Sequence, residues 1–306
     1  MSKTYDVLIV GGGPAGLAAA IYTGRARLST LILEKALPGG QILLTDWIEN
    51  YPGFAEGVNT FSLMDSFRAQ AERFGAKIGM EDIQKIEIKD DQWEVHGQED
   101  IYQAPVVIIA TGASHRKMGI PGEAELTGRG VSFCATCDGA FFRDKVVGVV
   151  GGGSWALSEA LFLTKFASVV KLFHRRQGFR AEKILQERVH AHEKIELVLD
   201  TVIEKINGAA KLETLSTRNV ISDQVSEVPC DGLFVSIGMI PNTAFLSDLL
   251  ELNEWGEIVV RKKMATSQPG IYAAGDVTDA CSNQVAIAAG AGVEAAMAAD
   301  EYISSL

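Results

Sequence analysis

The chain has 306 residues, 47% of them hydrophobic and 22% charged, and this length suits about two domains of ordinary size. Its formal net charge of -11 makes a nucleic acid or an anionic membrane surface an unfavourable partner, because either would be repelled over most directions of approach. We expect a globular α/β enzyme of the cytoplasm, since no basic and apolar leader segment precedes the first strand.

The first glycine turn follows an apolar strand predicted at residues 6–10 and leads into a helix predicted at 17–24. Gly11 permits the tight turn, Gly13 lets backbone amides approach a pyrophosphate, and Gly16 lets the helix pack closely on the strand. The helix N-terminus would then bind the anion. An ordinary glycine turn without a ligand is the alternative.

A second strand, predicted at residues 30–33, ends at Glu34, about 20 residues beyond the turn as a dinucleotide site requires. The carboxylate of Glu34 would accept hydrogen bonds from ribose hydroxyls. This first site is therefore predicted to bind a plain adenosine ribose.

The same order of elements returns in the second half of the chain. A strand is predicted at 145–150, a turn at 151–156, a helix at 157–166 and the next strand at 168–173. Gly151, Gly153 and Ala156 occupy the positions of this turn that face a ligand or the packed helix.

The second copy lacks an acid at the end of its second strand. His174, Arg175 and Arg176 stand there, and Arg180 follows four residues after Arg176. Guanidinium groups pair with a 2′-phosphate that a carboxylate would repel, so this site is predicted to bind NADPH. A solvated basic turn is the alternative.

Each copy closes with a similar strand and turn, at residues 106–113 and 232–238, and a further strand near the C-terminus ends at Gly275 and Asp276. This order predicts two Rossmann-like dinucleotide-binding domains, the second inserted into the first. Residues 285–299 are rich in alanine but interrupted by glycine and glutamate, which predicts a packed helix rather than a membrane span.

The first domain is predicted to comprise residues 1–113 and 241–306, and the second residues 114–240. The two crossings, near Gly112 and Gly238, would form a two-strand hinge.

Of the 4 cysteines, only Cys134 and Cys137 are closely spaced. In a reducing compartment such a pair is more typical of redox chemistry or metal binding than of a structural disulfide. A zinc site needs a second pair or nearby histidines, which the sequence lacks, so no metal is expected. Cys230 and Cys281 lie in or beside apolar stretches and are expected to be buried bystanders.

Taken in order, these motifs resemble those of the low-molecular-weight thioredoxin reductases over essentially the whole chain. The markers are Gly11-x-Gly13-x-x-Gly16, Gly39-Gly40-Gln41, Glu49-Asn50-Tyr51-Pro52-Gly53, Ala110-Thr111-Gly112-Ala113, Cys134-Ala135-Thr136-Cys137-Asp138-Gly139, His174-Arg175-Arg176 with Arg180, and Gly275-Asp276-Val277. The resemblance implies a homodimer that passes electrons from NADPH through FAD and a redox disulfide to thioredoxin. FAD would bind the first domain and NADPH the second, and the two would rotate between half-reactions.

The resemblance also implies roles for single residues of the first domain. Gln41 and Asn50 resemble positions near the flavin, although Asn50 could be only a turn residue. Asp276 resembles the residue that holds the ribityl chain, and Gln284 lies in the segment along the isoalloxazine. Asn283 stands where many members carry arginine, which bears on how the flavin is tuned.

Disulfide exchange needs one cysteine to attack the substrate disulfide and another to resolve the mixed disulfide. In the resembling family the second cysteine, here Cys137, contacts the flavin, so we assign electron acceptance to Cys137 and attack on the partner to Cys134. Asp138 resembles the family's acid/base, which protonates the leaving thiolate and later removes a proton. A helix-capping aspartate is the alternative.

Ser154 and Trp155 depart from the family pattern, which usually has a small polar pair in the second turn. The indole could occupy phosphate space or rotate outward. The leading prediction is an NADPH-dependent thioredoxin reductase. The alternatives are a related flavin-dependent disulfide reductase or dithiol oxidase with another donor or acceptor, such as ferredoxin or oxygen, and a non-catalytic nucleotide-binding scaffold.

Overall fold

Two parallel sheets of five strands organise the protein, and each belongs to a different part of the chain. The computed structural model describes residues 3–44, 47–281 and 283–306. Unit 1 consists of Met1–Ser114 with Ile240–Leu306, and unit 2 of His115–Met239. We describe each unit by itself.

The parallel sheet of unit 1 has the strand order β21-β10-β2-β3-β6. Its strands are β2 (Val7–Val10), β3 (Thr30–Glu34), β6 (Lys77–Met80), β10 (Val106–Ile109) and β21 (Ile271–Ala273). The central strands are continuous apolar runs, because a parallel sheet is covered on both faces. Successive side chains alternate, so Val7 and Ile9 join one core cluster while Leu8 and Val10 join another.

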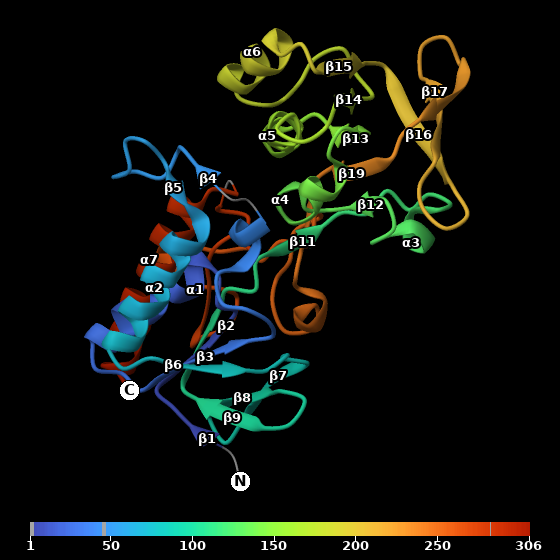
Figure 1. Ribbon diagram of the computed structural model, residues 1–306. Coiled ribbons are helices and arrows are strands. Elements are labelled where there is room, and N and C mark those ends of the chain that lie inside the picture. The colour runs from blue at the N-terminus through green and yellow to red at the C-terminus, as the bar shows by residue number, and fades with distance from the viewer. Residues whose placement is uncertain (1–2, 45–46, 282) are drawn as a thin grey trace. The chain divides into compact units, whose positions relative to one another are not determined.

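Helices α1 (Pro14–Arg25), α2 (Thr60–Arg73) and α7 (Val285–Ile303) lie together on one face of this sheet (Figure 1). The first helix starts with Pro14, whose fixed φ suits the first helical position. The second is capped by Asn59, whose side chain accepts the Ser62 N–H at 3.0 Å.

A four-stranded mixed sheet covers the opposite face, with the order β1-β9-β8-β7, in which β9, β8 and β7 are antiparallel and β1 pairs with β9 in parallel. Its strands are β1 (Lys3–Thr4), β7 (Lys85–Lys89), β8 (Gln92–His96) and β9 (Ile101–Ala104). Trp93, Val95 and Tyr102 pack with the sheet residues Leu8 and Val10 in a shared core. The shorter elements of the unit are η1 (Gly40–Leu44), β4 (Trp47–Ile48), β5 (Val58–Asn59), η3 (Ala244–Leu246) and η4 (Lys262–Met264).

Unit 2 repeats the parallel sheet with the order β12-β19-β13-β14-β15. Its strands are β12 (Val131–Ser132), β13 (Val146–Gly151), β14 (Val169–Phe173), β15 (Ile195–Val198) and β19 (Gly232–Ser236). The helices are α3 (Glu123–Leu126), α4 (Ala135–Asp138), η2 (Gly139–Phe142), α5 (Ser154–Leu163) and α6 (Lys183–Ala191). A three-stranded antiparallel sheet is formed by β16 (Thr201–Asn207), β17 (Thr214–Asn219) and β18 (Val225–Pro229).

The chain passes between the units at two strands that pair with each other, β11 (Ala113–His115) and β20 (Met239–Pro241). The first crossing lies just after Gly112 and the second just after Gly238. Both crossings therefore fall beside a glycine.

The predicted α/β class is confirmed, and the main differences lie at helix ends. Helices α1 and α5 begin at Pro14 and Ser154, earlier than predicted, because the last residues of each glycine turn already form the first helical turn. Helix α7 extends to Ile303. In the described part of the chain, no helix is long and apolar enough to cross a membrane.

Missing side chains let α1 approach its neighbours closely. A Cβ added to Gly16 would lie 1.9 Å from the carbonyl oxygen of Gly11, and one added to Gly292 of α7 would lie 2.1 Å from that of Ala15. Neither contact leaves room for a side chain. The packing of α1 on the strand before it and on α7 thus depends on these two glycines.

We expect Gly292→Ala to lower the free energy of unfolding by about 2 kcal/mol, because the new methyl group would force α1 and α7 apart. Gly290→Ala on the same helix is the matched control. No atom lies within 4 Å of its added Cβ, so it should stabilise the protein slightly through helix propensity. Urea unfolding of both variants measures the difference, and equal stabilities would contradict this packing.

Candidate active site

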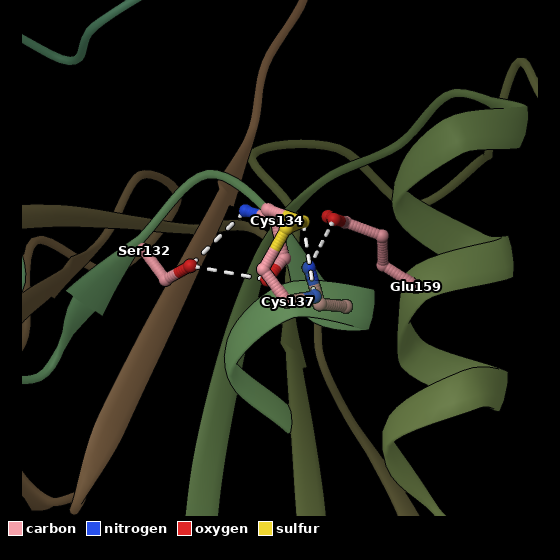
Figure 2. The surroundings of a disulfide bond; sticks show 5 residues. Ser132, Cys134, Cys137 and Glu159 are labelled. Atoms are coloured by element: carbon pink, nitrogen blue, oxygen red, sulfur yellow. Dashed lines mark hydrogen bonds between the residues drawn. A yellow bond between two sulfur atoms is a disulfide. The ribbon is translucent and has the colours of Figure 1, made fainter. Parts of the chain in front are cut away.

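A disulfide bond joins Cys134 and Cys137 at the start of α4 in unit 2, as the family resemblance implied. Cys134 is the N-cap residue of this helix, and its Sγ accepts the N–H of Cys137 at 3.0 Å. The hydroxyl of Ser132 accepts the Cys134 N–H at 3.0 Å and donates to the Cys134 carbonyl at 3.2 Å (Figure 2). Hydrogen bonds between the Ser132 hydroxyl and the Cys134 backbone therefore fix the pair at the end of β12.

The two cysteines differ in accessibility. Cys134 is buried, with 8% of its surface exposed, whereas Cys137 is exposed. Asp138 follows directly, is half-buried, and makes no capping hydrogen bond to η2 within the described chain. The capping alternative for Asp138 therefore lacks its hydrogen bond.

A buried carboxyl group, that of Glu159 on α5, reaches the same turn. Its Oε1 accepts the Ala135 N–H at 3.0 Å and its Oε2 accepts the hydroxyl of Ser236 at the end of β19. Figure 2 shows the side chain extending from its helix toward the cysteine turn. Burial raises the pKa of Glu159 to about 7, and the two hydrogen bonds oppose this rise only in part. Its one signal in the sequence is a carboxylate within a largely apolar helix, and the motifs above do not include it.

The first glycine turn, in unit 1, has its expected acid in place. Glu34 lies at the end of β3, where its Oε2 accepts the Gly12 N–H at 2.6 Å and its Oε1 accepts the Ala36 N–H at 2.9 Å. A carboxylate has further lone pairs, so ribose hydroxyls could still bind it. The Gly39 N–H donates to the Gly12 carbonyl at 2.8 Å, which brings the Gly39-Gly40-Gln41 marker onto the turn.

Two side chains of unit 1 hold buried oxygen atoms without a hydrogen-bond partner in the described chain, Oε1 of Gln41 and Oδ1 of Asp276. Burial also raises the pKa of the Asp276 carboxyl. Such oxygens fit a ligand that carries hydroxyl and N–H donors, as FAD does. The predicted flavin residues Asn50 and Gln284 are exposed and bonded to each other, from Asn50 Nδ2 to Gln284 Oε1 at 3.0 Å.

The second glycine turn, in unit 2, separates its basic residues into two kinds. The ring of His174 is buried against Gly152, and its Nε2 lies 3.2 Å from the Gly178 carbonyl. Burial lowers the pKa of His174, and the neighbouring arginines lower it further. His174 therefore lies beside the turn and supports it by packing against Gly152.

The three arginines are exposed instead. Arg175, Arg176 and Arg180 form no ion pair with any acidic side chain of the described residues. The Arg180 N–H donates to the Gly152 carbonyl at 2.8 Å, which ties the arginine segment to the turn. Exposed, unpaired guanidinium groups beside a helix start suit an anionic ligand.

Trp155 stands at the start of α5 and is half-buried. Its ring centroid lies 5.9 Å from that of His115, which in turn lies 6.1 Å from Phe133. The indole Nε1 and the His115 Nε2 have no hydrogen-bond partner in the described chain. Burial lowers the pKa of His115. The indole is thus packed on an aromatic neighbour of its own unit.

The two remaining cysteines are free thiols. Cys230 is 3% exposed, its Sγ lies 2.9 Å from the Gly232 carbonyl, and burial raises its pKa to about 12. Cys281 is half-buried, and burial raises its pKa as well. With a raised pKa, neither thiol would ionise readily. Because the thiolate is the reactive form, both cysteines are expected to be unreactive.

One group of side chains outside these turns has the ligand types of a metal site. Atoms of Glu87, Glu94 and His96 lie within 4.8 Å of one another on β7 and β8. Lys85 and Lys89 already pair with the two carboxylates, at 2.6 and 3.2 Å. The group is therefore an ion-pair network in the present arrangement.

Known proteins are similar to this chain over nearly its whole length. The pyridine nucleotide-disulphide oxidoreductase family model matches residues 5–298. The chain is 44% identical over 306 residues to the thioredoxin reductase of Treponema pallidum (strain Nichols). The matched region covers 100% of this chain and 99% of that protein.

Solved structures give the same picture. The crystal structure of Lactococcus lactis thioredoxin reductase matches with a TM-score of 0.96 and 40% identity over 99% of this chain and 100% of that one. That of T. acidophilum thioredoxin reductase matches with a TM-score of 0.93 and 33% identity over 99% of each. The similarity spans the full length of both.

Because burial raises the pKa of Glu159 from its ordinary 4.5 to about 7, the folded protein favours the protonated carboxyl. This contribution to stability is complete below about pH 4.5 and is lost as the pH rises to about 7. Glu159→Gln has no such loss. The difference in free energy of unfolding between the variant and the wild type should therefore shift in the variant's favour by about 2 kcal/mol from about pH 5 to about pH 8.

Urea unfolding of both proteins at the two pH values measures this. Glu187→Gln, which removes an exposed carboxylate of α6, should show no comparable gain. A difference between wild type and Glu159→Gln that does not change with pH would contradict the raised pKa.

Proposed function

The chain belongs to the pyridine nucleotide-disulphide oxidoreductase family, and we propose that it carries electrons from NADPH through bound FAD to the Cys134–Cys137 disulfide and then to thioredoxin or a thioredoxin-like protein. Its reaction is that of the thioredoxin reductases, which it matches over its whole length. The observation that carries the proposal is the disulfide held at the first turn of α4 beside a carboxyl-bearing residue, Asp138.

FAD is assigned to unit 1 because its glycine turn, Glu34 and the unpartnered oxygens of Gln41 and Asp276 match what that cofactor needs. Gly11, Gly13 and Gly16 would admit the pyrophosphate at the start of α1, and Glu34 would bind the adenosine ribose. Asp276 would accept a hydroxyl of the ribityl chain. Bound FAD would supply a carrier that takes two electrons from a nicotinamide and delivers them to a disulfide.

Asn50 and Gln284 are proposed to lie beside the flavin ring, although they now bond to each other. Their amide groups could exchange that hydrogen bond for one to the ring. Asn283 stands where the resemblance implies an arginine in many thioredoxin reductases, so this chain has a neutral residue there. This neutral residue would lower the positive charge near the ring.

Cys137 is proposed to receive the electrons, because it is the exposed member of the pair. When the disulfide breaks, Cys134 would be left as a thiolate that accepts the Cys137 N–H, and a hydrogen bond to the charged form favours it. Cys134 would then attack the partner's disulfide, and Cys137 would resolve the mixed disulfide. Because Cys134 is 8% exposed, this attack requires the turn to open after reduction.

Asp138 is proposed as the acid and base of these exchanges. It would donate a proton to the leaving thiolate and later remove one from a thiol. Its side chain is half-buried and makes no cap bond to η2 in the described chain, so its carboxyl group is not committed to the helix.

NADPH is assigned to unit 2. Gly151, Gly153 and Ala156 form the turn, and an added Cβ on Gly153 would meet no atom within 4 Å, so a pyrophosphate could approach the backbone there. Arg175, Arg176 and Arg180 would pair with the 2′-phosphate. The buried ring of His174 would support the turn by packing against Gly152.

A different donor or acceptor, such as ferredoxin or oxygen, is the second candidate, and Trp155 is the residue that favours it. Its indole keeps bulk beside the second turn, where small side chains usually stand. The packing of the indole on His115 supports the NADPH assignment instead, because it directs the ring toward β11. The exposed arginines also have no evident purpose without a 2′-phosphate.

We further propose that the protein is a homodimer of the cytoplasm. Cys230 and Cys281 are free thiols, which suits a reducing compartment, where unneeded disulfides do not form.

We expect the purified protein to be yellow with one FAD per chain. Asp276→Ala should retain less flavin on gel filtration, because the ribityl chain loses its acceptor. Asp248→Ala removes an exposed carboxylate of the same unit and should retain as much as the wild type. A folded, colourless wild type that ignores added FAD would refute this assignment.

Cys134→Ser and Cys137→Ser should each abolish disulfide reduction while the flavin remains bound, because one thiol cannot complete the exchange. Asp138→Asn should slow the thiol steps by about 10²-fold, the usual range for proton transfer. Stopped-flow reduction of thioredoxin measures both effects. Turnover by either serine variant would refute the assigned pair, and less than a twofold change in Asp138→Asn would refute the acid/base role.

Anaerobic titration with NADPH, followed at the flavin absorbance band, tests the donor. We expect NADPH to bleach the flavin, NADH to do so far less well, and Arg175→Ala with Arg176→Ala to narrow that preference. Lys205→Ala with Lys211→Ala removes the same charge from exposed sites of the unit and should leave the preference unchanged. A flavin that stays oxidised in NADPH but is bleached by reduced ferredoxin would establish the second candidate.

A further inference from the structure

Glu159 lies where the nucleotide-binding helix of unit 2 meets the redox turn. It is 6% exposed, and its two carboxyl oxygens accept hydrogen bonds from the Ala135 N–H and the Ser236 hydroxyl. The residue belongs neither to the glycine turn nor to the cysteine motif. A buried carboxyl group with no cationic partner is costly, so its position calls for a reason.

The carboxyl group and the redox sulfur bind the same helical turn. Ala135 is the first residue of α4, and its N–H is held by Glu159, while the Cys137 N–H is held by the Sγ of Cys134. These are neighbouring donors of one short helix. Figure 2 shows Cys134 and Glu159 at the same turn, and the two residues are only 8% and 6% exposed, so a charge on the Cys134 sulfur would be poorly screened from the carboxyl group.

Hydrogen bonds and burial alone set the state of this carboxyl group. The elements packed on α5 are α4, α6, β13, β14 and β19. Strands β13 and β19 carry no ionisable side chain, and the ionisable groups of the others are Cys134, Cys137, Asp138, Lys171, Lys183, Glu187, Arg188 and His190. None of these contributes to the raised pKa of Glu159, which comes from burial.

We propose that Glu159 is a positioning residue of the redox pair, which holds the first turn of α4 and takes up a proton when the Cys134–Cys137 disulfide is reduced. The inference rests on the proposed disulfide chemistry but not on the identity of the electron donor. Reduction breaks the bond between the two Sγ atoms and adds two electrons from the reduced flavin or a dithiol. It leaves Cys137 as a thiol, which takes one proton, and Cys134 as a thiolate.

The thiolate of Cys134 and a carboxylate at Glu159 would repel each other across the turn. Two like charges in a buried place raise each other's pKa, so reduction draws a proton onto Glu159 near neutral pH. By linkage, a deprotonated Glu159 makes the disulfide harder to reduce. The carboxyl group thus lowers the reduction potential of the pair as the pH rises above about 7.

Glu159→Gln tests this, because the amide keeps an acceptor for the Ala135 N–H and removes the charge. The purified flavoproteins are equilibrated in the same dithiothreitol redox buffers, and the reduced fraction of the Cys134 and Cys137 peptide is measured by alkylation and mass spectrometry. At about pH 8.5 the variant's equilibrium constant for reduction should exceed that of the wild type about tenfold, or about 30 mV. At about pH 6 the two should agree within about twofold, since Glu159 is then protonated.

Ser236→Ala provides a second variant that keeps the glutamate. It removes a hydrogen bond that favours the carboxylate, so more of Glu159 should be protonated at about pH 7.5. The reduction potential of Ser236→Ala should then lie between those of the wild type and Glu159→Gln. Glu123→Gln is the matched control. It alters another buried carboxyl group of unit 2, which accepts the Met118 and Gly119 N–H groups, and should not move the potential.

Potentials of Glu159→Gln and wild type that coincide at about pH 8.5, or that differ equally at both pH values, would overturn the inference, since a merely structural contact has no such pH dependence. In that case the proposed function would stand. A wild-type pair that dithiothreitol cannot reduce would refute the disulfide chemistry itself, and the inference with it.

Discussion

Both units depend on one constraint: a helix must pack very closely on the strand that precedes it. In unit 1 the missing side chain of Gly16 leaves room for the carbonyl of Gly11. In unit 2 the corresponding helix residue is Ala156, and the room is made on the other side, where an added Cβ on Gly151 would lie 2.6 Å from the Ala156 Cβ. Either arrangement brings a helix N-terminus to the carboxyl end of a parallel strand, where an anion can bind.

Helix α5 connects this constraint to the redox chemistry. Its first residues complete the second glycine turn, and five residues after Ser154 it carries Glu159, which reaches the first turn of α4. Ser236, at the carboxyl end of β19, binds the same carboxyl group. The parts that form the nucleotide fold of unit 2 therefore also hold the cysteine turn, so a single packing arrangement positions both.

The local parts of the site were predictable because each depends on residues close together in the chain. The glycine turns, Glu34 at the end of β3 and the Cys134–Cys137 pair all follow from spacing and residue type. The basic segment was predicted as a group, yet the fold divides it. His174 is buried against Gly152 while the arginines remain exposed, and spacing alone cannot tell which residues beyond a strand end face the core.

The sequence by itself determined the two glycine turns, the α/β class and the cysteine pair, because periodicity, glycine spacing and a short loop act over a few residues. Only the tertiary structure decided that Glu159 meets the Ala135 N–H, across 24 positions of the chain, and that Trp155 packs on His115. These contacts form when separate elements pack against one sheet. Burial then changes what a carboxyl group or an indole can do, and no local pattern records that burial.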